Sequence, residues 1–299
     1  MIQTVINPYI KLKENLSFHD YEEINNLQKL CFQYDQTTLK LEIDFKLNRA
    51  GIKIDRLNNI NEFMYYENDK LVGYIGLCYF GGNAIEINGM VHPEYRRRGI
   101  FTKLFSLAKE EWEKREYPKI LLLCDHNSIS GQEFIKNTGA VYCHSEYEMY
   151  LRDYPKQESI RNNIVFRKAT NQDAIEIARQ NAIYFEEDLI EENIIMPEEE
   201  EKHGSLIFLA EADGEIIGKV HLEIIDKVGG IYGLGVNPEY RGKGYGKEIL
   251  TQAIKKLTEK DLQEIMLQVA VKNKTALNIY KSCGFQETST MDYYEIMNH

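Results

Sequence analysis

The stretch Pro238-Glu-Tyr-Arg-Gly-Lys-Gly-Tyr-Gly246 is the most informative part of this chain. It stands between an apolar segment that ends at Val236 and an amphipathic segment, 246–258, whose apolar residues recur at helical spacing. Its three glycines carry no Cβ, so backbone N–H groups can close on a bulky anion, and the start of a helix adds unpaired donors. Arg241 and Lys243 add positive charge. A strand, a glycine-rich turn and a helix in this order predict a pyrophosphate site.

Other nucleotide-binding motifs do not fit this stretch. A Walker A loop, G-x-x-x-x-G-K-[ST], is absent, and the spacing Gly242-x-Gly-x-Gly differs from G-x-G-x-x-G. A hairpin signal at Asp213-Gly214 precedes the stretch, whereas a dinucleotide fold would require a parallel βαβ unit. A glycine-rich turn that binds no ligand remains open as an alternative.

A second motif follows the next predicted strand: Asn273-Lys-Thr-Ala276-Leu-Asn-Ile-Tyr280-Lys-Ser-Cys-Gly284-Phe285. On a helix, Asn273, Ala276 and Tyr280 fall on neighbouring faces. Asn273 suits the N-cap and Gly284 suits the C′ position. Tyr280 alone would be interpreted as a core residue. Next to a phosphate-binding turn, it becomes a candidate proton donor.

The chain also repeats itself. Val91-His-Pro-Glu-Tyr-Arg-Arg-Arg-Gly99 matches Val236-Asn-Pro-Glu-Tyr-Arg-Gly-Lys-Gly244 at an offset of 145 residues, and Lys136-Asn-Thr-Gly-Ala140 matches Lys281-Ser-Cys-Gly-Phe285 at the same offset. A domain-sized period indicates duplication rather than a solenoid. We expect an N-terminal domain over 1–152, a polar linker over 153–163 and a C-terminal domain over 164–299.

The pattern of apolar residues predicts the elements of the second half. Strands are expected at 163–167, 206–212, 216–225, 233–236 and 264–269, helices at 173–186, 246–258 and 275–282, and a turn at Gly229-Gly230. Tyrosine-rich alternating stretches at 146–151 and 291–297 predict a final strand for each half.

These motifs resemble those of the GNAT (GCN5-related N-acetyltransferase) family. Arg241-Gly-Lys-Gly-Tyr-Gly246 fits the family's Q/R-x-x-G-x-G/A motif at each fixed position, and the segment from Asn273 to Phe285 matches the family's later motif. The resemblance covers about 163–299 closely and 60–151 more weakly. It implies a mixed α/β (α+β) class with two tandem GNAT folds, each a mostly antiparallel, splayed sheet flanked by helices.

The resemblance further implies an N-acetyltransferase that moves the acetyl group of acetyl-CoA to a primary amine by direct attack. Acetyl-CoA is expected in a splay between the strand that ends at Val236 and the strand 264–269. Tyr280 is expected to protonate the leaving thiolate, and Glu223 is the candidate base, with an exposed strand carboxylate as its alternative. The residues expected to bind the cofactor are Leu234, Gly235, Val236, Arg241, Gly242, Lys243, Gly244, Tyr245, Gly246 and Asn273. A non-catalytic acyl-CoA-binding or regulatory protein is the alternative function.

The first half departs from the family pattern. Arg96 and Gly99 are kept, but Phe101 replaces the last small residue, which places bulk where phosphates would approach. The tyrosine position is Ile135, with Phe134 beside it. Asn127 is one residue out of register with Asn273, which implies a small insertion. We expect this half to lack the general acid, while binding of acyl-CoA stays open.

The composition of the chain limits the kinds of partner that it is expected to bind. The net charge of -11 argues against binding to nucleic-acid phosphates, which requires clustered Lys and Arg. The five cysteines are scattered without zinc spacing, so no metal is expected, and they fit a reducing cytoplasm. The first residues lack the apolar core of a signal peptide, and no apolar run approaches the roughly 18 residues that span a bilayer. We therefore expect a cytoplasmic protein without membrane or nucleic-acid partners.

An acidic stretch, 186–201, holds nine carboxylates in 16 residues. In GNAT proteins this region borders the acceptor pocket, so the resemblance implies a rim that would attract a cationic amine of a small molecule or peptide. A solvated helical face is the alternative.

Overall fold

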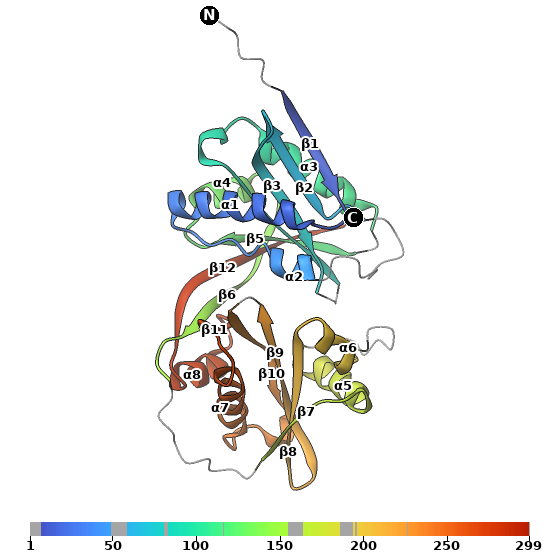
Figure 1. Cartoon of the computed structure of the whole chain (residues 1–299), viewed down its shortest axis with the longest axis vertical. Coiled ribbons are helices and arrows are strands. Elements are labelled where there is room, and N and C mark those ends of the chain that lie inside the picture. The colour runs from blue at the N-terminus through green and yellow to red at the C-terminus, as the bar shows by residue number, and fades with distance from the viewer. Residues whose placement is uncertain are drawn as a thin grey trace, which may run out of the picture. The chain divides into compact units, whose positions relative to one another are not determined.

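The computed structural model describes residues 7–48, 59–80, 83–115, 117–154, 164–185, 194, 196–225 and 227–298. The chain divides into two compact units, Met1–Ser145 with Ser289–His299 (unit 1) and Glu146–Thr288 (unit 2). Each unit has a mostly antiparallel sheet with helices on both faces (Figure 1), which confirms the expected class of two tandem α/β folds.

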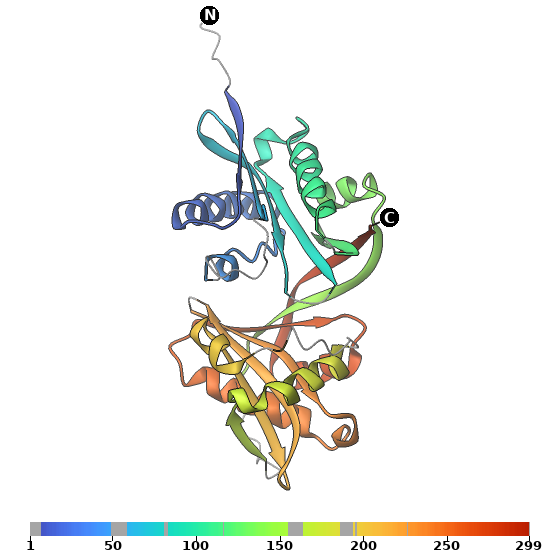
Figure 2. The same cartoon turned by 90° about the vertical axis from the view of Figure 1, so that its right-hand side faces the viewer.

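Unit 1 packs its helices on opposite faces of one sheet, with α1 around Ile24 and Leu27 on one face and α3 around Leu104 and Trp112 on the other (Figure 2). Its strand order is β1-β2-β3-β4-β5-β12, with only β4 and β5 parallel. The elements are β1 (Pro8–Lys13), α1 (Phe18–Asp35), α2 (Ile43–Asn48), β2 (Glu62–Glu67), β3 (Lys70–Cys78), β4 (Ala84–Val91), α3 (Ile100–Glu113), β5 (Lys119–Asp125), α4 (Ile129–Lys136) and the first part of β6 (Val141–Leu151).

Unit 2 follows the same plan. Its strand order is β6-β11-β10-β9-β8-β7, with only β10 and β11 parallel. The elements are β7 (Val165–Lys168), the 3-10 turn η2 (Asn171–Asp173), α5 (Ala174–Phe185), α6 (Pro197–Lys202), β8 (Ser205–Ala212), β9 (Glu215–Ile225), β10 (Val228–Val236), the 3-10 turn η4 (Pro238–Tyr240), α7 (Tyr245–Thr258), β11 (Glu264–Ala270), α8 (Lys274–Ser282) and the first part of β12 (Phe285–Met297).

Each unit is completed by a strand from the other half of the sequence. Residues 291–297 of β12 pair with β5 in unit 1, and residues 146–150 of β6 pair with β11 in unit 2. The compact units therefore differ from the contiguous ranges 1–152 and 164–299, because the alternating tyrosine-rich strands exchange places. Residues 155–163 of the expected linker lie outside the described residues.

The parallel strands of unit 2 separate along their length. β10 pairs with β11 only from Val228↔Glu264 to Ile231↔Leu267, whereas β10 stays with β9 as far as Val236. β11 continues beside β6 to Ala270. The expected splay is therefore present.

A bulge in β10 accompanies this separation. The register with β9 shifts between Tyr232 and Gly235, so two residues of β10, Gly233 and Leu234, face one residue of β9. Gly233 has a φ of 55°, which favours glycine. The bulge turns backbone groups of β10 away from the regular ladder at the point where β11 leaves.

Helix α7 forms because its sequence offers one continuous apolar face. Five side chains at helical spacing are buried against β9 and β10: Ile249, Leu250, Ala253, Ile254 and Leu257. Burial of each large side chain stabilises the unit by about 1.5–3 kcal/mol. The helix begins after Gly244, whose φ of 89° gives the left-handed turn that reverses the chain.

The predicted order of elements in the second half is confirmed, with one correction. The expected turn at Gly229-Gly230 is wrong, because both glycines lie inside β10 and pair with β9. They serve packing instead. A Cβ at Gly229 would lie 2.7 Å from Leu262 Cδ1, and one at Gly230 would lie 2.3 Å from the Tyr232 ring.

Candidate functional site

The glycine-rich turn links the end of β10 to the start of α7. Gly242 and Gly244 have φ values of 77° and 89°, a conformation that L residues rarely adopt. Apart from its two chain neighbours, no described residue has an atom within 4 Å of a Cβ built on Gly242, so the described residues leave the turn open on that side. Gly244 is the N-cap and provides no side-chain cap, which leaves the first N–H groups of α7 without a side-chain acceptor. Such a turn suits a bulky anion.

Arg241 is the first residue of this turn. Its Nε donates to the Val236 carbonyl at 2.9 Å, which fixes the start of the guanidinium. No carboxylate among the described residues pairs with its terminal nitrogens. The Lys243 ammonium lies 5.3 Å from the Tyr240 ring, and Tyr245 and Gly246 form the first turn of α7. The turn therefore combines open backbone donors with two cations.

Helix α8 is fixed at both ends as the sequence predicts. Asn273 Oδ1 accepts a hydrogen bond from the Ala276 amide at 3.1 Å, so Asn273 is the N-cap. Gly284 has a φ of 96°, and a Cβ there would lie 1.7 Å from the Asp153 carbonyl oxygen. Only glycine fits this position. The two ends set the rotation of the helix and thereby the direction of Tyr280.

Tyr280 combines a buried ring with an uncommitted hydroxyl. The residue is 8% exposed, and its ring packs against Phe285 with 6.3 Å between ring centroids. No described residue hydrogen-bonds to the hydroxyl. Burial raises the pKa of Tyr280 to about 12, which keeps the phenol protonated at neutral pH.

The remaining predicted residues lie on β9 and β10. Leu234, Gly235 and Val236 form the end of β10 after the bulge. Glu223 lies on β9, half-buried, opposite Gly230. It is therefore on the far side of the bulge from Leu234 and Val236. The predicted roles of these residues stay predictions.

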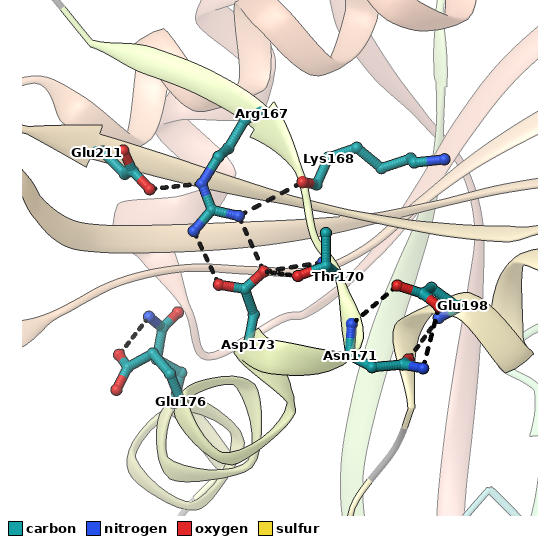
Figure 3. Close-up of polar contacts among 9 residues, drawn as sticks. Arg167, Lys168, Thr170, Asn171, Asp173, Glu176, Glu198 and Glu211 are labelled. Carbon is teal, nitrogen blue, oxygen red and sulfur yellow. Dashed lines mark hydrogen bonds and ion pairs between the residues drawn. The ribbon is translucent and has the colours of Figure 1, made fainter.

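A polar network anchors the helices on the other face of the sheet (Figure 3). Arg167 donates to Glu211 at 2.5 Å and to both oxygens of Asp173 at 2.8 and 2.9 Å. The guanidinium, together with the Thr170 amide, lowers the pKa of Asp173 to about 2. Asn171 exchanges two hydrogen bonds of 3.1 Å with Glu198, which ties α6 to the same corner. The entry to α5 is thus held on the edge of the sheet.

Helix α5 in turn reaches the end of β10 through a buried polar chain. Gln180, 0% exposed, donates to Glu176 at 2.8 Å and lies 3.1 Å from the Tyr184 hydroxyl. That hydroxyl lies 3.0 Å from Oδ1 of Asn237, which is 1% exposed and donates to the Ile216 carbonyl at 2.9 Å. The Tyr184 ring covers the backbone of β10 next to the bulge.

Two residues beside the bulge were not predicted from the sequence. Lys219 is 0% exposed, and its Nζ donates to the Gly233 carbonyl at 3.2 Å. The same Nζ lies 3.2 Å from Nε2 of His221. Lys219, His221 and Glu223 alternate along β9 and share one face, a signal that was present in an otherwise apolar strand.

The acidic stretch is only partly visible. Residues 186–193 and 195 lie outside the described residues. In α6, Glu201 pairs with Lys168 at 2.8 Å and Glu199 pairs with Lys202 at 2.6 Å. This part of the stretch behaves as a solvated helical face.

In unit 1 the equivalent site is filled. The Phe101 ring packs edge-on against Phe134 at 4.6 Å, in the place that Gly246 leaves open beside Ile279 in unit 2. The turn keeps its backbone shape, with φ values of 63° at Arg97 and 76° at Gly99. Ile135, buried in the core, stands where unit 2 has Tyr280, so the predicted lack of a hydroxyl holds.

One expectation about unit 1 is wrong. No insertion is needed near Asn127, because Ser128 lies at the 145-residue offset from Asn273 and caps α4 itself. Its Oγ accepts from the Gly131 amide at 3.3 Å. Serine and asparagine are interchangeable as caps, and the sequence comparison aligned the wrong polar residue.

Two kinds of feature are absent from the described part of the chain. No helix there is long and apolar enough to cross a membrane. Within the same residues, no group of three or more His, Cys, Asp or Glu side chains could hold a metal ion.

The chain is similar in sequence to known acetyltransferases. It is 24% identical to a mycothiol acetyltransferase of Saccharomonospora viridis over 246 residues, which is 74% of this chain and 78% of that protein. It is 41% identical over 90 residues to a mycothiol acetyltransferase of Streptomyces coelicolor. That second match spans only 28% of the length of each protein.

Solved structures with the same fold extend over the whole chain. A GCN5-related N-acetyltransferase of Sphaerobacter thermophilus superposes with a TM-score of 0.76 at 16% identity, covering 96% of this chain and 95% of that one. A tandem GNAT protein from the clavulanic acid biosynthesis pathway gives a TM-score of 0.70 at 14% identity, covering 97% and 98%.

The family model adds the assignment of each half. The model of the acetyltransferase (GNAT) family matches twice, over residues 21–139 and 167–285, which together make up most of the chain. The two matches agree with the repeated turn, the splay and the capped helix α8 described above. The chain belongs to the acetyltransferase (GNAT) family and carries the domain of that family twice.

Proposed function

We propose that unit 2 transfers the acetyl group of acetyl-CoA directly to a primary amine of a small molecule or peptide. The observation that carries the proposal is the coincidence of an open phosphate turn and an uncommitted buried phenol in one unit. Arg241 and the glycines of the turn lie at the start of α7, and Tyr280 lies on α8, which packs beside α7.

The residues of unit 2 fit coenzyme A in chemical terms. The turn 241–246 offers backbone N–H groups and the charges of Arg241 and Lys243 to a diphosphate. The bulge and the end of β10, Leu234–Val236, offer backbone groups to an extended pantetheine arm and to a thioester carbonyl. Bound acetyl-CoA would supply the activated acyl group.

Tyr280 would then supply a proton to the leaving thiolate. A phenol with a pKa of about 12 stays protonated at neutral pH, and it can protonate a thiolate as charge develops on the sulfur. The contrast with unit 1 supports this division of labour, because Ile135 has no proton to give and Phe101, packed on Phe134, stands at the position of Gly246. We therefore propose unit 2 as the catalytic unit.

For the acceptor of the acetyl group we propose a chemical class, the primary amines, and no single compound. Its amine must lose a proton before it attacks, and Glu223 is one candidate to take that proton. Two relatives bear the name mycothiol acetyltransferase, and the acidic segment before β8 favours a cationic acceptor in this chain.

The test measures release of the CoA thiol from acetyl-CoA with spermidine, glucosamine, ethylamine and a short peptide. Amine-dependent release that Tyr280→Phe suppresses would support the proposal. Binding of acetyl-CoA by calorimetry without turnover of any amine would favour the alternative, a non-catalytic acyl-CoA-binding protein. Absence of binding would contradict both.

A further inference from the structure

The side chain of Lys219 is buried and has no counter-ion among the described residues. Its Nζ contacts the Gly233 carbonyl and His221 Nε2, and it lies 5.6 Å from the centre of the Tyr184 ring. No carboxylate of the described residues pairs with it. An isolated buried ammonium is strongly disfavoured, so the site favours the neutral amine.

Unit 1 contains a buried lysine that is paired with a carboxylate. Lys46 lies with its ammonium 3.1 Å from Glu62 Oε2, and the same carboxylate accepts from the Tyr74 hydroxyl at 2.5 Å. Tyr74 stands at the 145-residue offset from Lys219. The fold therefore requires no lysine at this position of β9, and where it buries one elsewhere it provides an acid.

Among the described residues, no charged or titratable group near Lys219 stabilises its protonated, positively charged form. Burial alone lowers its pKa to about 7. Burial and Lys219 lower the pKa of His221 well below its ordinary value, so the imidazole stays neutral. From the packed elements, β8 contributes only Ile207 and Leu209 opposite this pair. The other charged or titratable groups on these elements are Glu211 on β8, Glu215 and Glu223 on β9, Tyr232 on β10, and Tyr184 with Glu176 and Arg179 on α5.

The pair is placed at the bulge. A Cβ built on Gly233 would lie 3.3 Å from Lys219 Nζ and 3.5 Å from His221 Cδ2, so both side chains flank this one residue. Lys219 is closed off from solvent, whereas His221 is half-buried and can be touched by a bound molecule. His221 is thus the member of the pair that keeps some exposed surface.

We propose that His221 and Lys219 form a two-step proton relay that deprotonates the acceptor ammonium. The inference rests on the proposed acetyl transfer and deepens it. The ammonium gives a proton to Nδ1 of His221, while Nε2–H of His221 passes its proton to the lone pair of Lys219 Nζ. His221 is the catalytic base, and Lys219 is the proton acceptor behind it.

The remaining steps balance. The neutral amine attacks the thioester carbonyl, the C–N bond forms and the C–S bond breaks. The sulfur takes the Tyr280 proton, and the acylated nitrogen returns one proton to the phenolate. Lys219 then releases its proton through His221 to solvent. The products are the acetylated amine, CoA thiol and one proton.

The test compares ethylamine with 2,2,2-trifluoroethylamine, which has the same length but is already neutral at pH 7. Lys219→Met and His221→Asn should each lower kcat/KM for ethylamine about 100-fold, the usual effect of losing a general base. For trifluoroethylamine the loss should stay below about fivefold, because no proton must be removed before attack. Lys227→Met, an exposed lysine of the same unit, should change neither rate.

Lys219→Arg separates the relay from a structural clamp. Arginine can still donate to the Gly233 carbonyl, but it stays charged and cannot take a proton. It should fail with ethylamine like Lys219→Met. Full activity of Lys219→Arg, or equal losses with both amines, would overturn the relay, as would a selective loss in Glu223→Gln alone.

Two controls keep the inference apart from the proposed function. Acetyl-CoA affinity, measured by calorimetry, should be unchanged in Lys219→Met, and the ¹³Cε resonance of Lys219 in the full chain should titrate near pH 7. A resonance that stays in the charged position above pH 9 overturns the relay only. A wild-type chain that binds acetyl-CoA but acetylates neither amine overturns the transfer to small amines and the relay with it.

Discussion

Arg96 donates two parallel hydrogen bonds to Asp35, with Nη1 and Nη2 at 2.7 and 2.5 Å from the two carboxylate oxygens. This pairing raises the pKa of Arg96 and leaves it no edge for another anion. Arg241, its counterpart at the 145-residue offset, has no such partner among the described residues. The two copies of one motif therefore differ, because Arg96 is paired with an acid of its own unit whereas Arg241 is not paired with one among the described residues.

This difference predicts opposite effects for the same substitution in the two units. Arg241→Ala should weaken acetyl-CoA binding about 10- to 100-fold, because one charge-assisted contact contributes about 1.5–3 kcal/mol. Arg96→Ala should leave that affinity unchanged and should lower the stability of unit 1 instead. Calorimetric titration of both variants checks this. Equal losses of affinity would mean that unit 1 also binds the cofactor.

The first turn of α7 predicts a sharp size limit at position 246. A Cβ on Gly246 would meet Ile279 Cδ1 at 3.5 Å and Val236 Cγ2 at 3.7 Å, which are ordinary contacts. Gly246→Ala should therefore bind acetyl-CoA nearly as well as wild type. Gly246→Phe, which copies Phe101, should lose at least about fivefold in affinity, since bulk forced into a fitted site costs about 1–3 kcal/mol. Similar affinities for the two variants would contradict a cofactor at this turn.

Much of this site could be predicted from the sequence, because glycine spacing and caps act locally. Gly242, Gly244 and Asn273 each perform a backbone task that depends only on near neighbours. The exchange of β6 and β12 could not be predicted, because pairing partners far apart in sequence leave the same alternating pattern in either arrangement.

The relay pair was missed for a related reason. Lys219 and His221 alternate with apolar residues along β9, a pattern that is typical of a strand with one face in solvent. The neighbouring sequence does not indicate that α5 covers this face. Their burial depends on Tyr184, which is tied to β10 by Gln180 and Asn237. Glu223 shares the same face, and the sequence predicts it as the base because it lies in a strand beside the expected cleft.

Tyr280→Phe should separate chemistry from binding. Loss of the general acid should lower kcat about 100-fold, while acetyl-CoA affinity stays the same because the ring packing is kept. Stability should also hold, since the hydroxyl has no partner among the described residues. Steady-state kinetics with parallel calorimetry checks this. Unchanged kcat would assign proton donation to another group or to water.

The pH dependence of stability gives a test of Lys219 that needs no substrate. Its pKa is about 7 in the folded protein and near 10.4 in an unfolded chain, so the unfolded state holds the extra proton between these values. Below pH 7 both states are protonated and the burial penalty is fully present. As the pH rises above 7 the folded protein releases the proton, and the free energy of unfolding increases.

Lys219→Met lacks this titration, so its advantage over wild type should shrink with rising pH. Because each pH unit is worth about 1.36 kcal/mol, the stability difference between the variant and wild type should change by about 2–3 kcal/mol from pH 6 to pH 9, in favour of wild type. Urea titrations followed by circular dichroism measure it, and they are preferable to tryptophan fluorescence because the single Trp112 lies in unit 1. The difference between the variant and wild type cancels the contributions of the tyrosines and carboxylates that titrate in both proteins. A pH-independent difference would mean that Lys219 stays charged when folded, paired with an acid, and could not accept a proton from His221.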